Sequence, residues 1–242
     1  MFALSATITM VVNMALFSGM LLLPIYVQTI RGISPLEAGI LMLPGALLMA
    51  VMSPITGKLF DKFGGRILAI IGLSITVITT YLFSQLTLET TYGHLMVLYS
   101  VRMFGMSMVM MPVSTNGLNQ LPRRFYPHGT AMNNTLNQVS GAIGTALLVT
   151  VMSMRTETHA TELAAEAMKN ATAQPTAAAM AEMEQQIQMQ AMLAGINDSF
   201  FVATFIAAVA LILAFFIKRA TQAEDPLEEK QVKKKVTTAK LV

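Results

Sequence analysis

Long apolar stretches alternate with short polar segments along the chain. A membrane span needs roughly 20 predominantly apolar residues. The stretches that approach or exceed this length are 4–30, 38–56, 67–88, 93–119, 129–152 and 197–217. Several of them contain proline or glycine, such as Pro24, Pro44 and Gly105, which transmembrane helices tolerate because neighbouring helices satisfy the freed backbone groups. The pattern predicts an all-α integral membrane protein with six transmembrane helices.

Two polar segments lie outside these spans. Residues 153–196 are rich in Ala, Met, Glu and Gln, a composition that favours helix, and Pro175 is expected to divide them into two short helices. We expect an extracytoplasmic helical hairpin here, which is either a lid or an inert solvated connector. Residues 218–242 are expected to form a disordered basic cytoplasmic tail. The predicted division of the chain is 1–152 for five spans, 153–196 for the hairpin, 197–217 for the last span and 218–242 for the tail.

Composition supports a lipid environment and argues against catalysis. The chain has 242 residues, 54% hydrophobic and 12% charged, whereas soluble domains carry about 25% charged residues. The absence of cysteine excludes disulfides and thiol chemistry, and the three scattered histidines match no catalytic or metal-binding motif. We therefore expect no enzyme activity, no cofactor, no metal and, because the basic residues do not cluster on a soluble face, no nucleic acid. The 21 methionines are either apolar filler or a surface that adapts to varied ligands.

Basic residues collect on one side of the membrane when the six spans alternate in direction. If the 57–66 loop is cytoplasmic, that side holds Lys58, Lys62, Arg66, Arg123, Arg124, Lys218, Arg219, Lys230, Lys233, Lys234, Lys235 and Lys240. The opposite side holds only Arg31, Arg155 and Lys169. This asymmetry follows the positive-inside rule. It predicts a multi-pass protein of the cytoplasmic (inner) membrane with both termini in the cytoplasm.

The segment between the second and third spans is Gly57-Lys58-Leu59-Phe60-Asp61-Lys62-Phe63-Gly64-Gly65-Arg66. It resembles the G-x-x-x-D-[RK]-x-G-[GRK]-[RK] signature of the major facilitator superfamily, which occupies a short cytoplasmic loop. Gly57 permits two helices to approach closely, and Gly64 gives the backbone freedom for a tight turn. Asp61 can accept hydrogen bonds from a helix N-terminus or pair with Arg66. The predicted conformational gate is Gly57, Asp61, Lys62, Gly64 and Arg66.

The resemblance continues over nearly the whole chain. Its other segments are 23–28, 32–39, 43–46, 102–107 and 129–134, followed by Gln138, Gly141 and Gly144. They resemble the C-terminal half of fourteen-span drug:proton antiporters of the EmrB/QacA type, although Met103 and Ser107 depart from that family's R-G-x-G-x-G run. The resemblance implies the C-terminal half-bundle of a major facilitator fold. It also implies proton-coupled efflux of lipophilic, often cationic small molecules by alternating access.

Facilitator transporters have two six-span halves with the pathway between them, and this chain resembles only the second. Met1 opens the first span without a basic flank, so we expect that the true beginning of the chain, and the N-terminal half as a partner, are missing. No Asp or Glu lies well inside the six stretches, since Glu37, Glu89 and Asp198 lie only at their edges, and an embedded carboxylate is the natural proton carrier. The alternatives are a non-transporting six-span subunit, a decayed gene product, or a transporter assembled from two such halves.

A set of polar and flexible residues inside the spans forms the candidate substrate pathway. Its members are Asn13, Met14, Phe17, Met20, Arg102, Met106, Asn133 and Asn137. Arg102 is the sole ionisable residue well inside a span, and it either lines the pathway or donates hydrogen bonds to interior carbonyls. Asn133 and Asn137 share one helix face with Gly141. That face either joins helices or contacts substrate.

Overall fold

The computed structural model describes residues 2–118, 122–170 and 177–216, and this part of the chain is entirely helical apart from short connections. The elements are α1 (Phe2–Ile25), η1 (Tyr26–Ile30), α2 (Pro35–Phe63), α3 (Gly65–Phe83), α4 (Tyr92–Leu118), η2 (Arg123–Phe125), α5 (Tyr126–Asn170) and α6 (Ala177–Ala214). Six helices are long and apolar enough to cross a membrane. The all-α prediction with six spans is confirmed.

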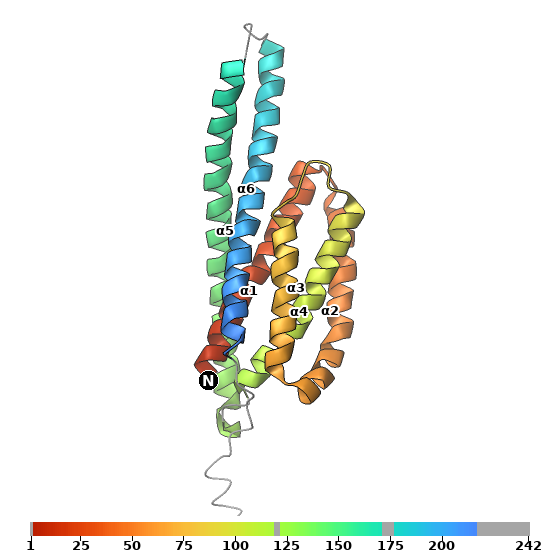
Figure 1. Ribbon diagram of the computed structural model, residues 1–242, viewed down its shortest axis with the longest axis vertical. Coiled ribbons are helices and arrows are strands. Elements are labelled where there is room, and N and C mark those ends of the chain that lie inside the picture. The colour runs from red at the N-terminus through yellow and green to blue at the C-terminus, as the bar shows by residue number, and fades with distance from the viewer. Residues whose placement is uncertain (1, 119–121, 171–176, 217–242) are drawn as a thin grey trace, which may run out of the picture.

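The bundle has two sides that meet at α1 and α4 (Figure 1). On one side α4 packs against α2 and α3, and on the other α1 packs against α5 and α6. Contacts of α1 with α4 and of α3 with α6 close the bundle. The most apolar window of α4 is 61% buried, against 17% for α2 and 22% for α5. The helices α2 and α5 therefore leave much of their surface uncovered.

Local sequence sets the two ends of α2. Ser34 caps its N-terminus: the Glu37 amide donates to the Ser34 hydroxyl, and Glu37 accepts from the Ser34 amide in return. This reciprocal arrangement satisfies two amides that the first turn leaves without helical partners. At the other end Gly64 adopts φ 81° and is the single residue between α2 and α3. Only glycine adopts such a backbone without steric cost, so the chain reverses direction there.

The described residues between 153 and 196 are helical, and they are continuous with the adjacent spans. The arms of the hairpin are the continuations of α5, which has 45 residues, and α6, which has 38. They project past the other helices (Figure 1). No proline or glycine lies between Thr145 and Asn170, so nothing interrupts the helix where the apolar span ends. The expected break near Gln174-Pro175 and the tail at 218–242 fall outside the described residues.

Hydrogen bonds fix both the base of this hairpin and η1 to the connection between α3 and α4. The Asn197 amide donates to the Leu86 carbonyl at 2.9 Å, and the Tyr26 hydroxyl donates to the Thr87 carbonyl at 2.6 Å. We call this end of the bundle the hairpin end, and the opposite one the Gly64 end. One buried apolar cluster lies toward the hairpin end, with Tyr26, Phe83 and Phe200, and another, with Ile8, Leu73 and Val109, toward the Gly64 end.

Two glycines allow α3 and α4 to touch through their backbones. A Cβ atom on Gly72 would lie 2.5 Å from the Gly105 carbonyl oxygen, and one on Gly105 would lie 2.9 Å from the Gly72 oxygen. Because lipid gives helices no hydrophobic drive to associate, such close backbone contact is a main source of attraction between them. A side chain at either position forces the helices apart.

We expect Gly72→Ala to lower the stability of the protein by about 1–3 kcal/mol, the usual cost of overpacking. The measurement is thermal unfolding in detergent, followed by the size-exclusion peak of folded protein. Gly39→Ala is the matched control, because a Cβ atom at Gly39 meets nothing within 4 Å. Equal melting temperatures for the two variants would contradict the close α3–α4 contact.

Candidate substrate pathway

Asn13 of α1 and Asn137 of α5 form a direct polar bridge. Asn13 is 3% exposed. Its amide nitrogen lies within hydrogen-bonding distance of both the Thr9 carbonyl and the Asn137 side-chain oxygen, 2.9 Å in each case. Both asparagines were candidates from the sequence, and the structure brings them together. An amide pair between helices is a stabilising contact in lipid, and it is also a polar site in an otherwise apolar contact.

Glycines beside this bridge receive the apolar side chains of α1. A Cβ atom on Gly141 would lie 2.6 Å from a ring carbon of Phe17, and one on Gly144 would lie 2.7 Å from the Met14 Cα atom. Phe17 and Met14 are therefore held in the contact between α1 and α5. Both are half-buried, so each still presents some surface.

The other candidates differ in their exposure. Met20 is 51% exposed, whereas Met106 is fully buried in the cluster toward the Gly64 end. Asn133 is half-buried one turn before Asn137 on α5. In this conformation Met20, Asn133 and Asn137 can meet a ligand, while Met106 can do so only if the helices move apart.

Arg102 is the largest fully buried side chain. One terminal nitrogen, Nη2, donates to the Ala15 carbonyl of α1 at 2.6 Å. The guanidinium reaches α1 across Gly19, where any Cβ atom would overlap Nη1. This geometry favours the second of the two expectations for Arg102, a hydrogen bond to an interior carbonyl. A buried guanidinium is costly without such acceptors, so Gly19 and Ala15 make its position tolerable.

The predicted gate lies at the Gly64 end. Gly57 is inside α2, and a Cβ atom there would lie 3.1 Å from the terminal carbon of Met111 on α4. Asp61, Lys62 and Arg66 are exposed on either side of the Gly64 junction. The Lys62 ammonium lies 5.4 Å from the centre of the Phe63 ring. These charges face solvent around the turn between α2 and α3, and their role as a gate stays a prediction.

Sequence reasoning missed an ionic cluster at the base of the hairpin. Arg155 of α5 pairs with the Asp198 carboxylate of α6. The same carboxylate lies 2.9 Å from His159, whose other ring nitrogen lies 3.5 Å from Glu162. The available signal was an acidic residue at the start of the last span opposite a basic residue at the end of the fifth. Because 43 positions separate Arg155 from Asp198, their pairing depends on the register of the two long helices.

We expect the substitutions Gly19→Ala and Arg102→Ala to be strongly non-additive. Gly19→Ala alone should destabilise by about 1–3 kcal/mol, because its methyl group displaces the guanidinium. Once Arg102→Ala has removed that group, adding Gly19→Ala should cost little, giving a coupling free energy of about 0.5–3 kcal/mol. The measurement is the same thermal unfolding in detergent for both single variants and the double variant. Simple addition of the two effects would show that Arg102 does not occupy the space beside Gly19.

Comparison with known proteins places these features in a family. Residues 1–145 match the model of the Major Facilitator Superfamily. The chain is 44% identical to the uncharacterized MFS-type transporter YhcA of Bacillus subtilis, with 95% of this chain and 47% of that protein aligned. It is 40% identical to the lincomycin resistance protein LmrB of Listeria innocua, covering 91% of this chain and 43% of the relative. The colistin resistance protein EmrB of Acinetobacter baumannii is 24% identical, over 67% of this chain and 32% of that protein.

The chain thus spans about half the length of the curated relatives it matches. The family match covers more than half of this sequence, and it agrees with six apolar helices packed through glycines and buried polar contacts. The chain belongs to the major facilitator superfamily.

Proposed function

We propose that this chain supplies the C-terminal half of a proton-coupled multidrug exporter that works by alternating access. The observation that carries the proposal is the alignment of nearly the whole chain with less than half of proteins named for lincomycin resistance. Members of the major facilitator superfamily are transporters, not enzymes. The chemistry to explain is therefore the binding and release of a transported compound. The resemblance of the segments 23–28, 32–39, 43–46 and 129–134 to the second half of fourteen-span antiporters supports the C-terminal rather than the N-terminal half.

The spans α2 and α5 leave apolar surface uncovered, and in a membrane either lipid or a second half of the transporter can cover it. On α2 the exposed apolar residues recur every three or four positions, at Leu36, Ile40, Leu43, Leu47, Val51 and Ile55. On the part of α5 before residue 152 they are Met132, Val139, Ile143 and Leu147. These are the two least buried spans, and they lie on opposite sides of the central pair of α1 and α4. In a two-half transporter the pathway lies between the halves, so an N-terminal half would cover parts of both.

The proposed orientation places the Gly64 end in the cytoplasm and the hairpin end outside. The basic residues Lys58, Lys62, Arg66 and Arg124 at the Gly64 end support it. Both termini are then cytoplasmic. Asp61 and Arg66 would open and close the cytoplasmic side as α2 and α3 move.

The bridge between Asn13 and Asn137 is the proposed polar contact for substrates. Its neighbours Phe17 and Met14 give an apolar, adaptable surface suited to lipophilic compounds. Residues 1–36, 38–60, 62–88, 90–156 and 199–217, which include the cores of all six spans, contain no Asp or Glu. A proton-carrying carboxylate within the membrane would then come from the N-terminal half. This chain would contribute one side of the substrate pathway and the cytoplasmic gate.

The first test measures ethidium efflux from cells that produce this chain alone, or together with the N-terminal half of the Bacillus subtilis relative. We expect efflux only with both halves, and we expect a protonophore to abolish it. The control is the N-terminal half alone. Efflux by this chain alone that an uncoupler stops would refute the assignment of the proton site to the other half. Assembly of both halves without any efflux would favour a non-transporting six-span subunit.

The second test addresses the gate. In the two-half transporter, Asp61→Asn should slow efflux about tenfold, since a hydrogen bond to a charged group contributes about 1.5–3 kcal/mol. Glu182→Gln is the matched control, because it removes a carboxylate far along the hairpin. Efflux by Asp61→Asn at the rate of the control would exclude a gating role for this carboxylate.

A further inference from the structure

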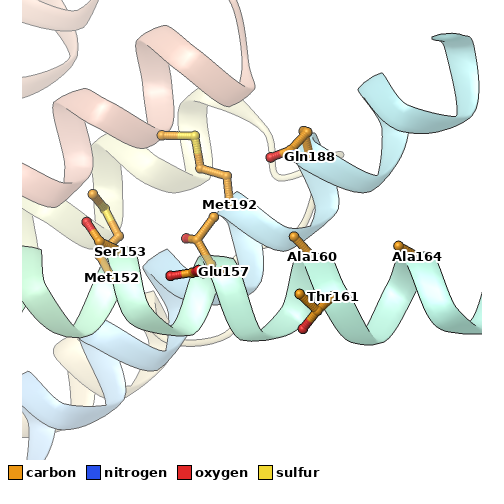
Figure 2. Close-up of a pocket in the computed structure, with 9 residues that line it drawn as sticks. Met152, Ser153, Glu157, Ala160, Thr161, Ala164, Gln188 and Met192 are labelled. Atoms are coloured by element: carbon orange, nitrogen blue, oxygen red, sulfur yellow. The ribbon is translucent and has the colours of Figure 1, made fainter.

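The hairpin end holds a cavity that the proposed pathway does not use. Its volume is about 630 Å³, within the range of roughly 300–1,000 Å³ typical of small-molecule sites. Seven lining residues come from α5 between Met152 and Ala164, and α6 contributes Gln188 and Met192. Figure 2 shows the lining residues of α5 beside the stretch of α6 that carries Gln188 and Met192. The cavity lies where the hairpin leaves the rest of the bundle.

One wall of the cavity is apolar and adaptable. Met152 and Met192 pack against the buried cluster toward the hairpin end, so the base of the cavity is continuous with the protein core. Ala160 and Ala164 lie one turn apart on α5 and leave room for a ligand because their side chains are small. Thioether side chains fit irregular apolar surfaces, including aromatic rings. This wall suits a flat or lipophilic molecule.

The polar wall carries one carboxylate, that of Glu157. Thr161 and Gln188 add neutral polar groups. Within the part of the chain that the structure describes, Glu157 forms no ion pair, whereas the nearby Asp198 pairs with Arg155 and lies beside His159. A carboxylate without a cationic partner at the edge of an apolar surface attracts a cation.

The charge of the whole hairpin points the same way. Residues 153–198 contain two basic residues, Arg155 and Lys169, and six carboxylates. The carboxylates are those of Glu157, Glu162, Glu166, Glu182, Glu184 and Asp198. The remaining basic residues are concentrated elsewhere, mostly at the Gly64 end and in the C-terminal segment. An acidic surface raises the local concentration of cations and lowers that of anions. The occupant selected by both shape and charge is a lipophilic organic cation.

We propose that this cavity is a second binding site for lipophilic organic cations, separate from the Asn13–Asn137 bridge, with Glu157 as the counter-ion. The choice of ligand class, and the position of the site on the outer side, rest on the proposed function. A cation that leaves the pathway at the hairpin end would meet this site before it reaches bulk water. The site would also capture such a cation from the outside.

The test is a fluorescence titration of ethidium against the complete 242-residue chain in phosphatidylcholine nanodiscs, with empty nanodiscs as the baseline. We expect saturable binding that Glu157→Gln weakens about tenfold, a change equivalent to about 1.4 kcal/mol. Glu157→Asp keeps the charge and should stay within threefold of the parent. Ala160→Trp places a bulky indole in the cavity beside Glu157 and should abolish the same binding component.

Glu166→Gln is the matched control, because it removes the same charge from the same helix outside the cavity lining. It should change the affinity less than twofold, and Glu157→Gln should leave the binding of neutral Nile red unaltered. Equal ethidium affinities for Glu157→Gln and Glu166→Gln would overturn the proposal. So would unchanged affinity in Ala160→Trp, since the cation would then bind elsewhere.

The titration needs no proton gradient and no second half, so it separates this site from the export function. If the two-half transporter shows no efflux while Glu157-dependent binding persists, the export proposal fails and the site stands. If efflux is present but binding is independent of Glu157, the site fails and export stands.

Discussion

Contacts of α1 with α4 and of α3 with α6 hold the two sides of the bundle together, and the guanidinium of Arg102 is buried in the first of them. The group is completely buried, donates to the Ala15 carbonyl, and passes over a glycine that leaves space for it. In lipid an unsatisfied charge is far more costly than in water, so Arg102 favours the arrangement in which α1 is close enough to accept its hydrogen bond. The packing of α5 and α6 on α1, and of α2 and α3 on α4, builds outward from this contact.

Glycine and amide residues hold other pairs of helices close together. Gly72 and Gly105 bring two backbones together, Gly141 and Gly144 admit Phe17 and Met14, and Asn13 meets Asn137. Each arrangement replaces hydrophobic attraction, which lipid does not provide between helices, with close contact or a hydrogen bond. Contacts of this type are also reversible, because two amides can separate and bind a ligand or water instead. This reversibility is why the same residues serve both as packing and as the proposed substrate surface.

The six spans could be predicted from hydropathy, but their ends and partners could not. The helix α2 begins at Pro35 and continues to Phe63, beyond the apolar stretch 38–56, because the Ser34 cap and Gly64 determine its ends. Arg102 was identifiable as a lone intramembrane charge, yet its acceptor is a backbone carbonyl, which carries no signal in sequence. The pair of Arg155 and Asp198 and the cavity beside Glu157 arise only from the register of two long helices. Family motifs marked the residues of the proposed gate, and its opening would require α2 and α3 to move relative to each other.

The uninterrupted helix of α5 has a mechanical consequence. From Gly144, where it crosses α1, it runs without a glycine or proline to Asn170, a length of about 39 Å at 1.5 Å per residue. A tilt of about 10° at that crossing would displace the far end of the helix by roughly 7 Å over this length. A small rearrangement beside the asparagine bridge would therefore produce a larger displacement at the far end of α5. A spectroscopic label placed there would report that displacement without altering the membrane-embedded residues.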